Sequence, residues 1–200
     1  INNEDGNVMC PSDGKVVVAQ FSSNDIFCLD LKGDLVWLRG LTHDFPNAAN
    51  GLGMSSSPVI SKGVLIAQVE NDADSFTTGI NLNNGETIWK NERPKGANWT
   101  SPVLLGIGPT QKVALQSLKG ISIINPSTGE EFWDYQDGAS TIPSSTPVQD
   151  ILLVPSNGLT ALKSLPGGNS HTQLWQDNKL GPGTGSPVIS GDRILVINKA

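Results

Sequence analysis

The chain has 200 residues, a formal net charge of -6 at pH 7 and a hydrophobic fraction of 37%. The acidic balance and the lack of a Lys/Arg cluster argue against nucleic-acid binding, and no apolar run approaches the roughly 18 residues that cross a bilayer. The 22 glycines and 13 prolines, without any long helical pattern, favour many short strands joined by tight turns.

The first predicted unit covers about residues 7–39 and ends in a strand that carries Trp37. Its expected strands are Val8–Pro11, Val16–Gln20, Asp25–Leu31 and Asp34–Leu38. Gly33 lies in the turn between the last two strands. The connection that follows, Leu38–Met54, is longer than the later ones, and such loops commonly carry specificity. Its candidate interaction residues are His43, Asp44, Phe45 and Asn50.

The second unit, about residues 55–92, shows the pattern most clearly. Val64–Val69 is nearly all apolar, as expected for a strand buried on both faces. Gly85 occupies a hairpin turn where a positive φ is needed, and Trp89 lies on the outermost strand. The acidic loop Glu70–Ser75 has acids at spacings that suggest calcium, but it lacks the glycine and the distal Glu of an EF-hand. A solvated hairpin loop is therefore favoured there.

Two further units cover about residues 99–135 and 144–178, and a fifth, 183–200, stops after its second strand. Their outer strands carry Trp133, which follows a turn at Gly129, and Trp175. In the fourth unit the expected turn is replaced by a longer loop between Lys163 and Gln173. His171 in this loop is a further candidate interaction residue. An exposed histidine is favoured over a metal ligand, because no partner lies at ligand spacing.

A second landmark, a hydroxyl residue followed by Pro and Val, fixes the repeat length. Its prolines are separated by 44, 45 and 40 residues, and they are Pro58, Pro102, Pro147 and Pro187. A period of roughly 40–45 residues with four short strands is typical of a propeller blade. We therefore predict an all-β fold, a β-propeller of four-stranded antiparallel blades. About four blades are complete and a fifth is partial, as part of a ring of about 6–8 blades completed by further blades or by another chain.

The phrase Asn125-x-x-Thr128-Gly129-x-x-x-Trp133 and the Ser/Thr-Pro-Val strand starts resemble the PQQ-like (quinoprotein alcohol dehydrogenase-like) β-propeller repeat. The likeness extends to the BamB-like branch, whose members lack a demonstrated cofactor. It implies that one tryptophan per blade packs on the neighbouring blade and donates its indole N–H to backbone. The residues that match are Trp37, Trp89, Trp133 and Trp175, with turn glycines Gly33, Gly85 and Gly129. It also implies a bacterial protein that is periplasmic, secreted or associated with the outer membrane.

The same resemblance bears on catalysis. Dehydrogenases of the family use a vicinal Cys–Cys disulfide, a tryptophan floor, a calcium ion held by Glu and Asn, and an Asp base. Cys10 and Cys28 are far from vicinal, so no cofactor is predicted. A non-catalytic scaffold or protein-interaction module is expected. The alternatives are a fragment of a dehydrogenase that uses PQQ with calcium, and a module that binds carbohydrate or another small ligand in an axial channel.

Several residues remain as candidates around that channel. The second strands end in amides that form a polar mouth or tie down their own hairpin loops: Gln20, Gln68, Gln116 and Asn198. Trp99 lies outside the docking positions, and packing within its own loop is favoured over lining the axis. Cys10 and Cys28 are placed on strands separated by a third, beyond the ~7 Å Cα reach of a disulfide. Two free, mostly buried thiols are therefore expected.

Overall fold

The structure is a computed structural model that describes residues 10–48 and 55–198. Strands dominate the described residues, which also form one helix of 4 residues, α1 (Leu41–Asp44), and a 3-10 turn, η1 (Gly108–Thr110). The chain divides into two compact units. One holds the residues up to Ser101 together with Ser127–Gly129, and the other holds Pro102–Pro126 and the residues from Glu130 onward.

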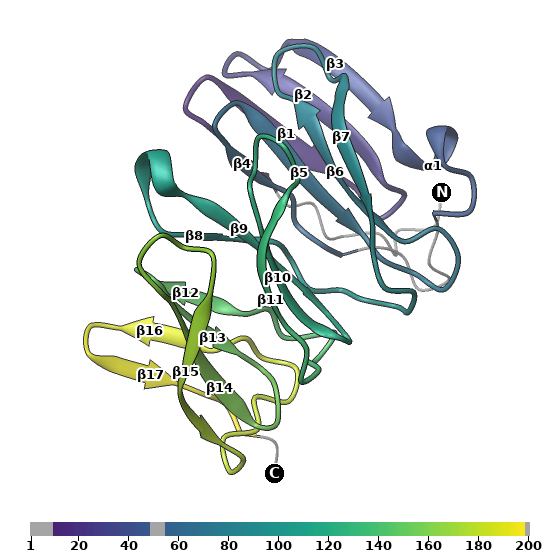
Figure 1. The fold of residues 1–200 in the computed structure, drawn as a ribbon. Helices are drawn as coiled ribbons and strands as arrows, with labels where there is room; N and C mark the ends of the chain where they lie inside the picture. The colour runs from purple at the N-terminus through teal and green to yellow at the C-terminus, as the bar shows by residue number, and fades with distance from the viewer. Residues whose placement is uncertain (1–9, 49–54, 199–200) are drawn as a thin grey trace. The chain divides into compact units, whose positions relative to one another are not determined.

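The first unit contains two antiparallel sheets, each with its strands in chain order (Figure 1). The first sheet is three-stranded and consists of β1 (Val16–Gln20), β2 (Asp25–Asp30) and β3 (Leu35–Gly40). The second is four-stranded and consists of β4 (Val59–Ser61), β5 (Val64–Val69), β6 (Phe76–Asn81) and β7 (Thr87–Glu92).

The strand expected at Val8–Pro11 lies only partly within the described residues. Beside β1, the carbonyl of Pro11 accepts the Val18 N–H at 2.9 Å and Ser12 bridges Val17. Cys10 and Pro11 themselves belong to no strand, so this part of the expectation is wrong.

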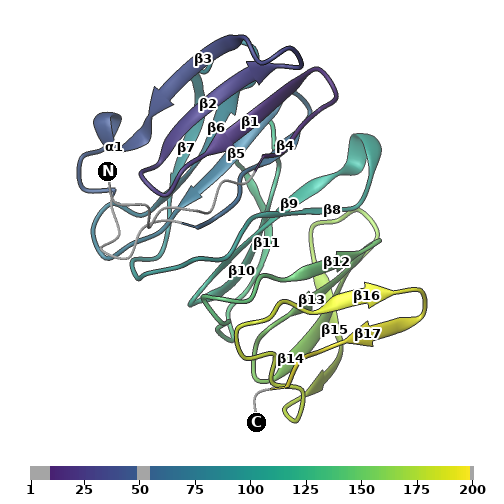
Figure 2. The same ribbon diagram turned by 180° about the vertical axis from the view of Figure 1, so that it is seen from behind.

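The second unit contains three antiparallel sheets (Figure 2). Two are four-stranded: β8 (Val103–Leu105), β9 (Lys112–Ser117), β10 (Gly120–Ile124) and β11 (Glu131–Tyr135); then β12 (Thr146–Val148), β13 (Ile151–Val154), β14 (Leu159–Ser164) and β15 (His171–Asp177). The third is a hairpin of β16 (Val188–Ser190) and β17 (Arg193–Leu195). The all-β prediction with four-stranded antiparallel blades is confirmed. The blade bounds and the size of the ring stay predictions.

Apolar side chains from the sheet faces form the core of each unit. Every residue of β5 is buried, because the strand lies inside its sheet and both of its faces are covered. In the first unit Phe76 is fully buried and its ring lies 4.6 Å from that of Phe45. In the second unit Leu152 and Ile123 belong to one continuous apolar cluster. Burying side chains of this size stabilises a fold by about 1.5–3 kcal/mol each.

A β-bulge accompanies the tryptophan in each of the four outer strands. The residue facing the tryptophan is Cys28, Gly79, Ile123 or Ala161, and the register shifts at the next pair in every case. A bulge increases the local twist and changes the direction of a side chain. The bulge is therefore part of how each blade aims its tryptophan.

Candidate functional site

The first two tryptophans pack onto the turn of the following blade. The Trp37 indole covers Gly85, where an added Cβ would lie 2.9 Å from its ring, and its Nε1 donates to the Leu82 carbonyl at 2.8 Å. Trp89 covers Gly129 in the same way, with 2.7 Å to an added Cβ. Both glycines have a φ of 75°, so they combine a left-handed backbone with the absence of a side chain.

Side chains two residues after these tryptophans bind the same turns. Arg39 donates to the Gly85 carbonyl at 3.0 Å, and Asn91 donates to the Gly129 carbonyl at 2.6 Å. Each turn is therefore held by an aromatic face and by a hydrogen bond. These contacts belong to the frame of the blades.

The third tryptophan has a different partner. The Trp133 ring lies 4.5 Å from the His171 ring, and its buried Nε1 has no hydrogen-bond partner among the described residues. Tyr135 meets the same imidazole edge-on at 6.1 Å. Burial lowers the pKa of His171, while the negative charge of Asp134 acts in the opposite direction. His171 is the first residue of β15 and is half-buried, so the prediction of an exposed histidine in a loop is wrong. It lies four residues before Trp175, the position that a turn glycine has in the earlier blades.

The last tryptophan and the first turn glycine do not make the tryptophan–glycine contact. Trp175 remains 36% exposed, so the expected docking of this tryptophan is not found among the described residues. The sheet after it consists of β16 and β17 alone, which offer no third-to-fourth-strand turn. At the other end, nothing lies within 4 Å of a Cβ built on Gly33.

The glutamines expected at a channel mouth are buried. Gln20, Gln68 and Gln116 expose 4, 1 and 2% of their surface, so they do not form an open polar ring. Gln116 binds the linker to the next blade: its Nε2 donates to the carbonyls of Ser140 and Pro143, and its Oε1 accepts from the Ser145 N–H and hydroxyl.

The pairing registers also correct the position assigned to Asn198. Ser61 pairs with Val64 in one blade and Ser190 pairs with Arg193 in the other, which makes Ile197 the counterpart of Gln68. Asn198 is exposed, and its Oδ1 accepts the Gly181 N–H at 3.0 Å. The predicted position is therefore wrong by one residue.

Glu70 is the centre of a buried polar cluster that the sequence analysis missed. It exposes 1% of its side chain and pairs with Arg93 at 2.7 Å, while Asn98 and Gln68 donate to it at 2.8 and 3.1 Å. Burial raises the pKa of Glu70, and the Arg93 charge and the two amide donors oppose that shift. The prediction of a solvated loop is wrong for this residue. The acid is held by residues 23 and 28 positions away, and no local pattern indicates such partners.

The long connection after β3 contributes two exposed candidates, His43 and Asp44. The His43 side chain is 93% exposed, Asp44 pairs with Arg39, and Asn50 lies outside the described residues. Phe45 packs against Phe76 and is half-buried, so it belongs to the core. The Arg39 guanidinium lowers the pKa of Asp44.

Trp99 and the two cysteines are the last candidates from the sequence, and Cys28 lies beside Trp37, with its Sγ 3.9 Å from the Leu82 carbonyl. Trp99 is half-buried, between the buried residues Asn98 and Thr100. Both thiols are free, but Cys10 is exposed and only Cys28 is buried, so the prediction of two mostly buried thiols is half wrong. Burial raises the pKa of Cys28. Within residues 10–48 and 55–198, no group of three or more His, Cys, Asp or Glu side chains could hold a metal ion.

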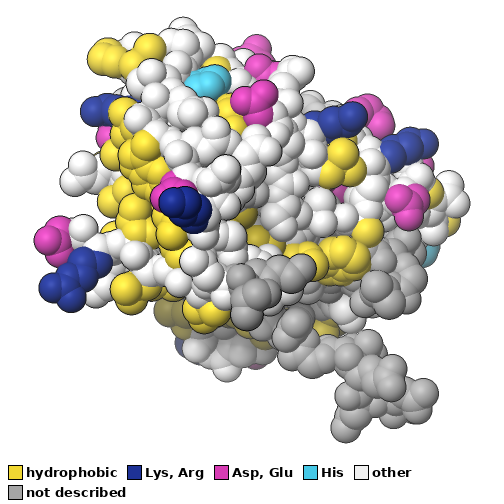
Figure 3. Space-filling view, turned by 90° about the horizontal axis from the view of Figure 1, so that it is seen from below, with side chains coloured by type: hydrophobic (Ala, Val, Ile, Leu, Met, Phe, Trp, Pro, Cys, Tyr) yellow, Lys and Arg dark blue, Asp and Glu magenta, His cyan; other side chains and the backbone are white. Residues whose placement is uncertain are grey.

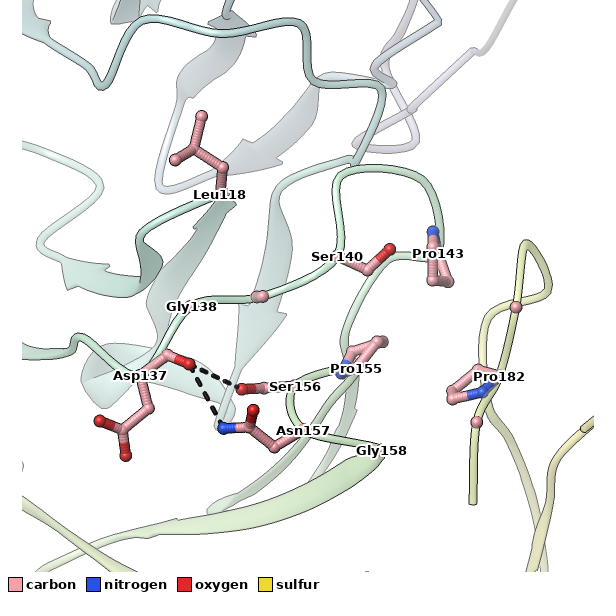
Figure 4. Close-up of a pocket in the computed structure, with 13 residues that line it drawn as sticks. Leu118, Asp137, Gly138, Ser140, Pro143, Pro155, Ser156, Asn157, Gly158 and Pro182 are labelled. Atoms are coloured by element: carbon pink, nitrogen blue, oxygen red, sulfur yellow. Dashed lines mark hydrogen bonds between the residues drawn. The ribbon is translucent and has the colours of Figure 1, made fainter. Parts of the chain in front are cut away.

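The second unit has a loop pocket of about 440 Å³ at the ends of β9, β13 and β15 (Figure 4). Four glycines and three prolines contribute to its wall. The Asp137 carbonyl accepts from Ser156 and Asn157 at 3.4 Å each, whereas its carboxylate points away from Pro155 and Pro182. The wall offers hydroxyl, amide and backbone groups, which suit recognition of a polar surface and supply no acid–base pair.

Charged side chains pair locally. Lys90 lies 3.5 Å from Glu92, and Lys163 lies 3.6 Å from Asp150. On the face in Figure 3, Lys and Arg side chains stand singly, several of them beside an Asp or Glu. That face has no gathered basic patch.

Comparison with known proteins identifies relatives of this architecture. A family model described as outer membrane protein assembly factor BamB matches residues 3–200. No curated protein matches the sequence. Among solved structures, the chain is similar to BamB from Moraxella catarrhalis, with 18% identity, a TM-score of 0.66 and coverage of 97% of this chain and 56% of that one. It is also similar to the computationally designed Ika4 protein, with 11% identity, a TM-score of 0.56 and coverage of 87 and 94%. At these identities the structural likeness shows the fold alone.

The tryptophan–glycine contact predicts a large effect of a small substitution. Gly85→Ala adds a methyl group against Trp37 at a positive φ, and we expect a loss of about 2–4 kcal/mol in the free energy of unfolding. Gly63→Ala is the matched control, because Gly63 has the same φ of 75° and open space around its Cβ. It should cost only the backbone strain, about 1–2 kcal/mol. Urea unfolding followed by tryptophan fluorescence measures both; equal losses would refute a steric role for Trp37.

The environment of His171 predicts a pH dependence. Its folded-state pKa lies below the value of about 6.5 for an unfolded chain, so the unfolded chain binds a proton first as the pH falls. The stability contribution is fully present above pH ~6.5 and is lost below it. His171→Phe keeps an aromatic ring against Trp133 and removes the titrating group. Its urea midpoint should therefore change less with pH between 8 and 5.5 than that of the wild type. His43→Gln, at an exposed position, should keep the wild-type slope; a wild-type slope in His171→Phe would contradict this assignment.

Proposed function

This chain belongs to the BamB family of PQQ-like β-propeller proteins, and on that premise we propose that it is a non-catalytic scaffold that binds protein partners. It spans 56% of the Moraxella BamB chain. The contact surface proposed here is the apolar strand surface, defined as Leu35, Val36 and Leu38 on β3 with Leu31 in the preceding turn.

The observation that supports this surface is a comparison of the four described outer strands. The residues two before, one before and one after the tryptophan are Leu35, Val36 and Leu38 in β3, and they are 58, 45 and 51% exposed. The corresponding triplets of the other outer strands are Thr87, Ile88 and Lys90; Glu131, Phe132 and Asp134; and Gln173, Leu174 and Gln176. Among these strands, β3 alone is apolar at all three positions.

The chemistry of this surface suits an extended protein segment. β3 is the outer strand of its sheet, and an edge strand presents unpaired backbone donors and acceptors. A segment that adds alongside such a strand gains main-chain hydrogen bonds, and its apolar side chains cover those of the edge. Covering Leu31, which is 64% exposed, and the three side chains of β3 removes apolar area from water.

The two alternatives from the sequence have less support. The axial ligand hypothesis rested on a mouth of amides, and those glutamines are buried. The dehydrogenase hypothesis requires a vicinal disulfide, which Cys10 and Cys28 do not provide. The proposal therefore assigns no cofactor to this chain, and the net charge of -6 gives no reason to propose a nucleic-acid partner.

The proposed location is extracytoplasmic, in the periplasm or at the outer membrane, as the family description suggests. In the part of the chain that the structure describes, no helix combines the length and apolar character needed to cross a bilayer. The exposed apolar strand surface would then meet a partner in the same compartment.

Photo-crosslinking tests the scaffold. Val36→p-benzoylphenylalanine should give a covalent product with one envelope protein of the source organism, identified by mass spectrometry and then titrated as purified protein. Ile88→p-benzoylphenylalanine is the control, because Ile88 is 49% exposed at the same position of β7. The double variant Leu35→Lys/Leu38→Lys should weaken binding at least tenfold and shift stability by no more than about 0.5 kcal/mol. Equal products from positions 36 and 88, or unaffected binding by the double variant, would refute the surface.

A cofactor assay separates the scaffold from the dehydrogenase alternative. Incubation with PQQ and calcium should give no difference absorbance and no dye-linked oxidation of alcohols, because the cysteine pair of such a site is missing from these residues. A quinoprotein dehydrogenase reconstituted in parallel is the positive control. Calcium-dependent absorbance together with dye reduction would favour the alternative.

A further inference from the structure

Two departures from the blade pattern lie together in the second unit. The β8–β9 connection, Gly106–Gln111, contains η1, whereas the other described connections of this kind are two-residue turns: Lys62–Gly63, Gln149–Asp150 and Gly191–Asp192. The β14–β15 hairpin continues for three residue pairs beyond its bulge, and the last two are Lys163 with Thr172 and Ser164 with His171. In the other outer hairpins, pairing stops at the first pair after the bulge.

A cavity of about 620 Å³ lies between these two departures, a volume in the range of small-molecule sites. Gly106 and Thr110 line it from the β8–β9 connection, and Ser164 and Leu165 line it from the hairpin. Both walls are therefore built from residues that the regular repeat does not require.

The cavity holds a net positive charge within an acidic chain. Lys112, Lys163 and Asp150 are the charged residues of its wall, whereas the chain as a whole carries -6. Lys112 donates to the Gly168 carbonyl and its Nζ lies 4.2 Å from the centre of the Phe132 ring, which fixes its position. An ammonium group has three donors, so two remain for another acceptor. Lys163 is paired with Asp150 at 3.6 Å and is 43% exposed, which places it at the rim.

Ser164 also lines the cavity, but its Oγ is buried and makes no hydrogen bond within the described residues. Because a water-sized group does not reach this oxygen, the binding of an anion is assigned to the lysines. Burial lowers the pKa of Lys112, and the negative charge of a bound anion would oppose that shift.

The remaining wall is apolar. Leu105 exposes 3% of its surface, and Leu165 and Pro166 complete this side of the cavity. A ligand that fits both parts has an anionic head and a short apolar body. A single negative charge matches two lysines opposed by one aspartate, and a dianion would be repelled by Asp150.

We propose that this cavity binds a monocarboxylate with a short apolar body, its carboxylate held by Lys112 with Lys163 at the rim. The ligand has two possible sources, a free fatty acid or the C-terminus of a peptide, which share this chemistry. The assignment is independent of the surface on β3, because the two lie in different units and use different residues.

Isothermal titration with sodium octanoate tests the head and the body separately. Octanamide keeps the body without the charge, and acetate keeps the charge without the body. Both should bind at least tenfold more weakly than octanoate. Equal affinities of octanoate and octanamide, or no octanoate binding, would overturn the proposal.

Variants assign the site. Lys112→Met should weaken octanoate binding at least tenfold. Lys179→Met, an exposed lysine outside the cavity, should leave it within twofold. Lys112 also holds Gly168, so Lys163→Met provides a rim variant that does not depend on that contact and should weaken binding about threefold. If both Lys112→Met and Lys163→Met bind octanoate like wild type, the site is refuted.

A second pair of ligands distinguishes the sources. Acetyl-Leu-Leu with a free carboxylate is compared with its C-terminal amide. Tighter binding of the acid than of octanoate supports a peptide terminus, and the reverse supports a fatty acid. Loss of crosslinking at β3 with intact octanoate binding would refute the scaffold surface alone, and the opposite result would refute this cavity alone.

Discussion

The contact between a tryptophan and a turn glycine is the interaction on which the blade frame depends. Trp37 covers Gly85 and reaches the Leu82 carbonyl, and Trp89 covers Gly129. The glycine meets two demands at once, since its φ is 75° and any Cβ would press into the indole. The bulge beside each tryptophan directs the ring toward that turn. The Gly-x-x-x-Trp phrase is thus a packing rule, and it says little about a ligand.

The fourth blade shows the effect of a change in this contact. Its hairpin extends by two pairs, so Trp133 meets His171 in place of a glycine and loses a partner for its buried Nε1. The same two pairs carry Lys163 and Ser164 into the wall of the cavity. The altered tryptophan contact and the new cavity are two consequences of one lengthened hairpin. An unpaired indole N–H is a cost that the regular repeat avoids.

The sequence predicted the strands and their order well, because alternation and turn residues are local signals repeated in every unit. It failed where the partner is distant in the chain. Glu70 looks like part of a polar loop, yet its carboxylate is satisfied by Arg93 and Asn98. Gln116 looks like a mouth residue, yet its amide binds the linker to the next blade. The sequence singled out the Lys163–Gln173 loop on one side of the cavity, but it did not single out the β8–β9 connection on the other side, and only the structure shows that the two line one cavity.

A frame held by buried tryptophans leaves functional change to positions where substitutions cost little. Exposed residues outside such contacts alter stability by about 0.5 kcal/mol or less, so the outer face of β3 could become apolar without disturbing Trp37 beneath it. Hairpin length can also change at little cost in stability, since the entropic cost of closing a loop rises only slowly with each added residue. Both proposed surfaces lie at such positions, one on an edge strand and one between extended loops. Because the tryptophan contact fixes the backbone on each side of a departure, a few residues are enough to give a blade a surface or a cavity that its neighbours lack.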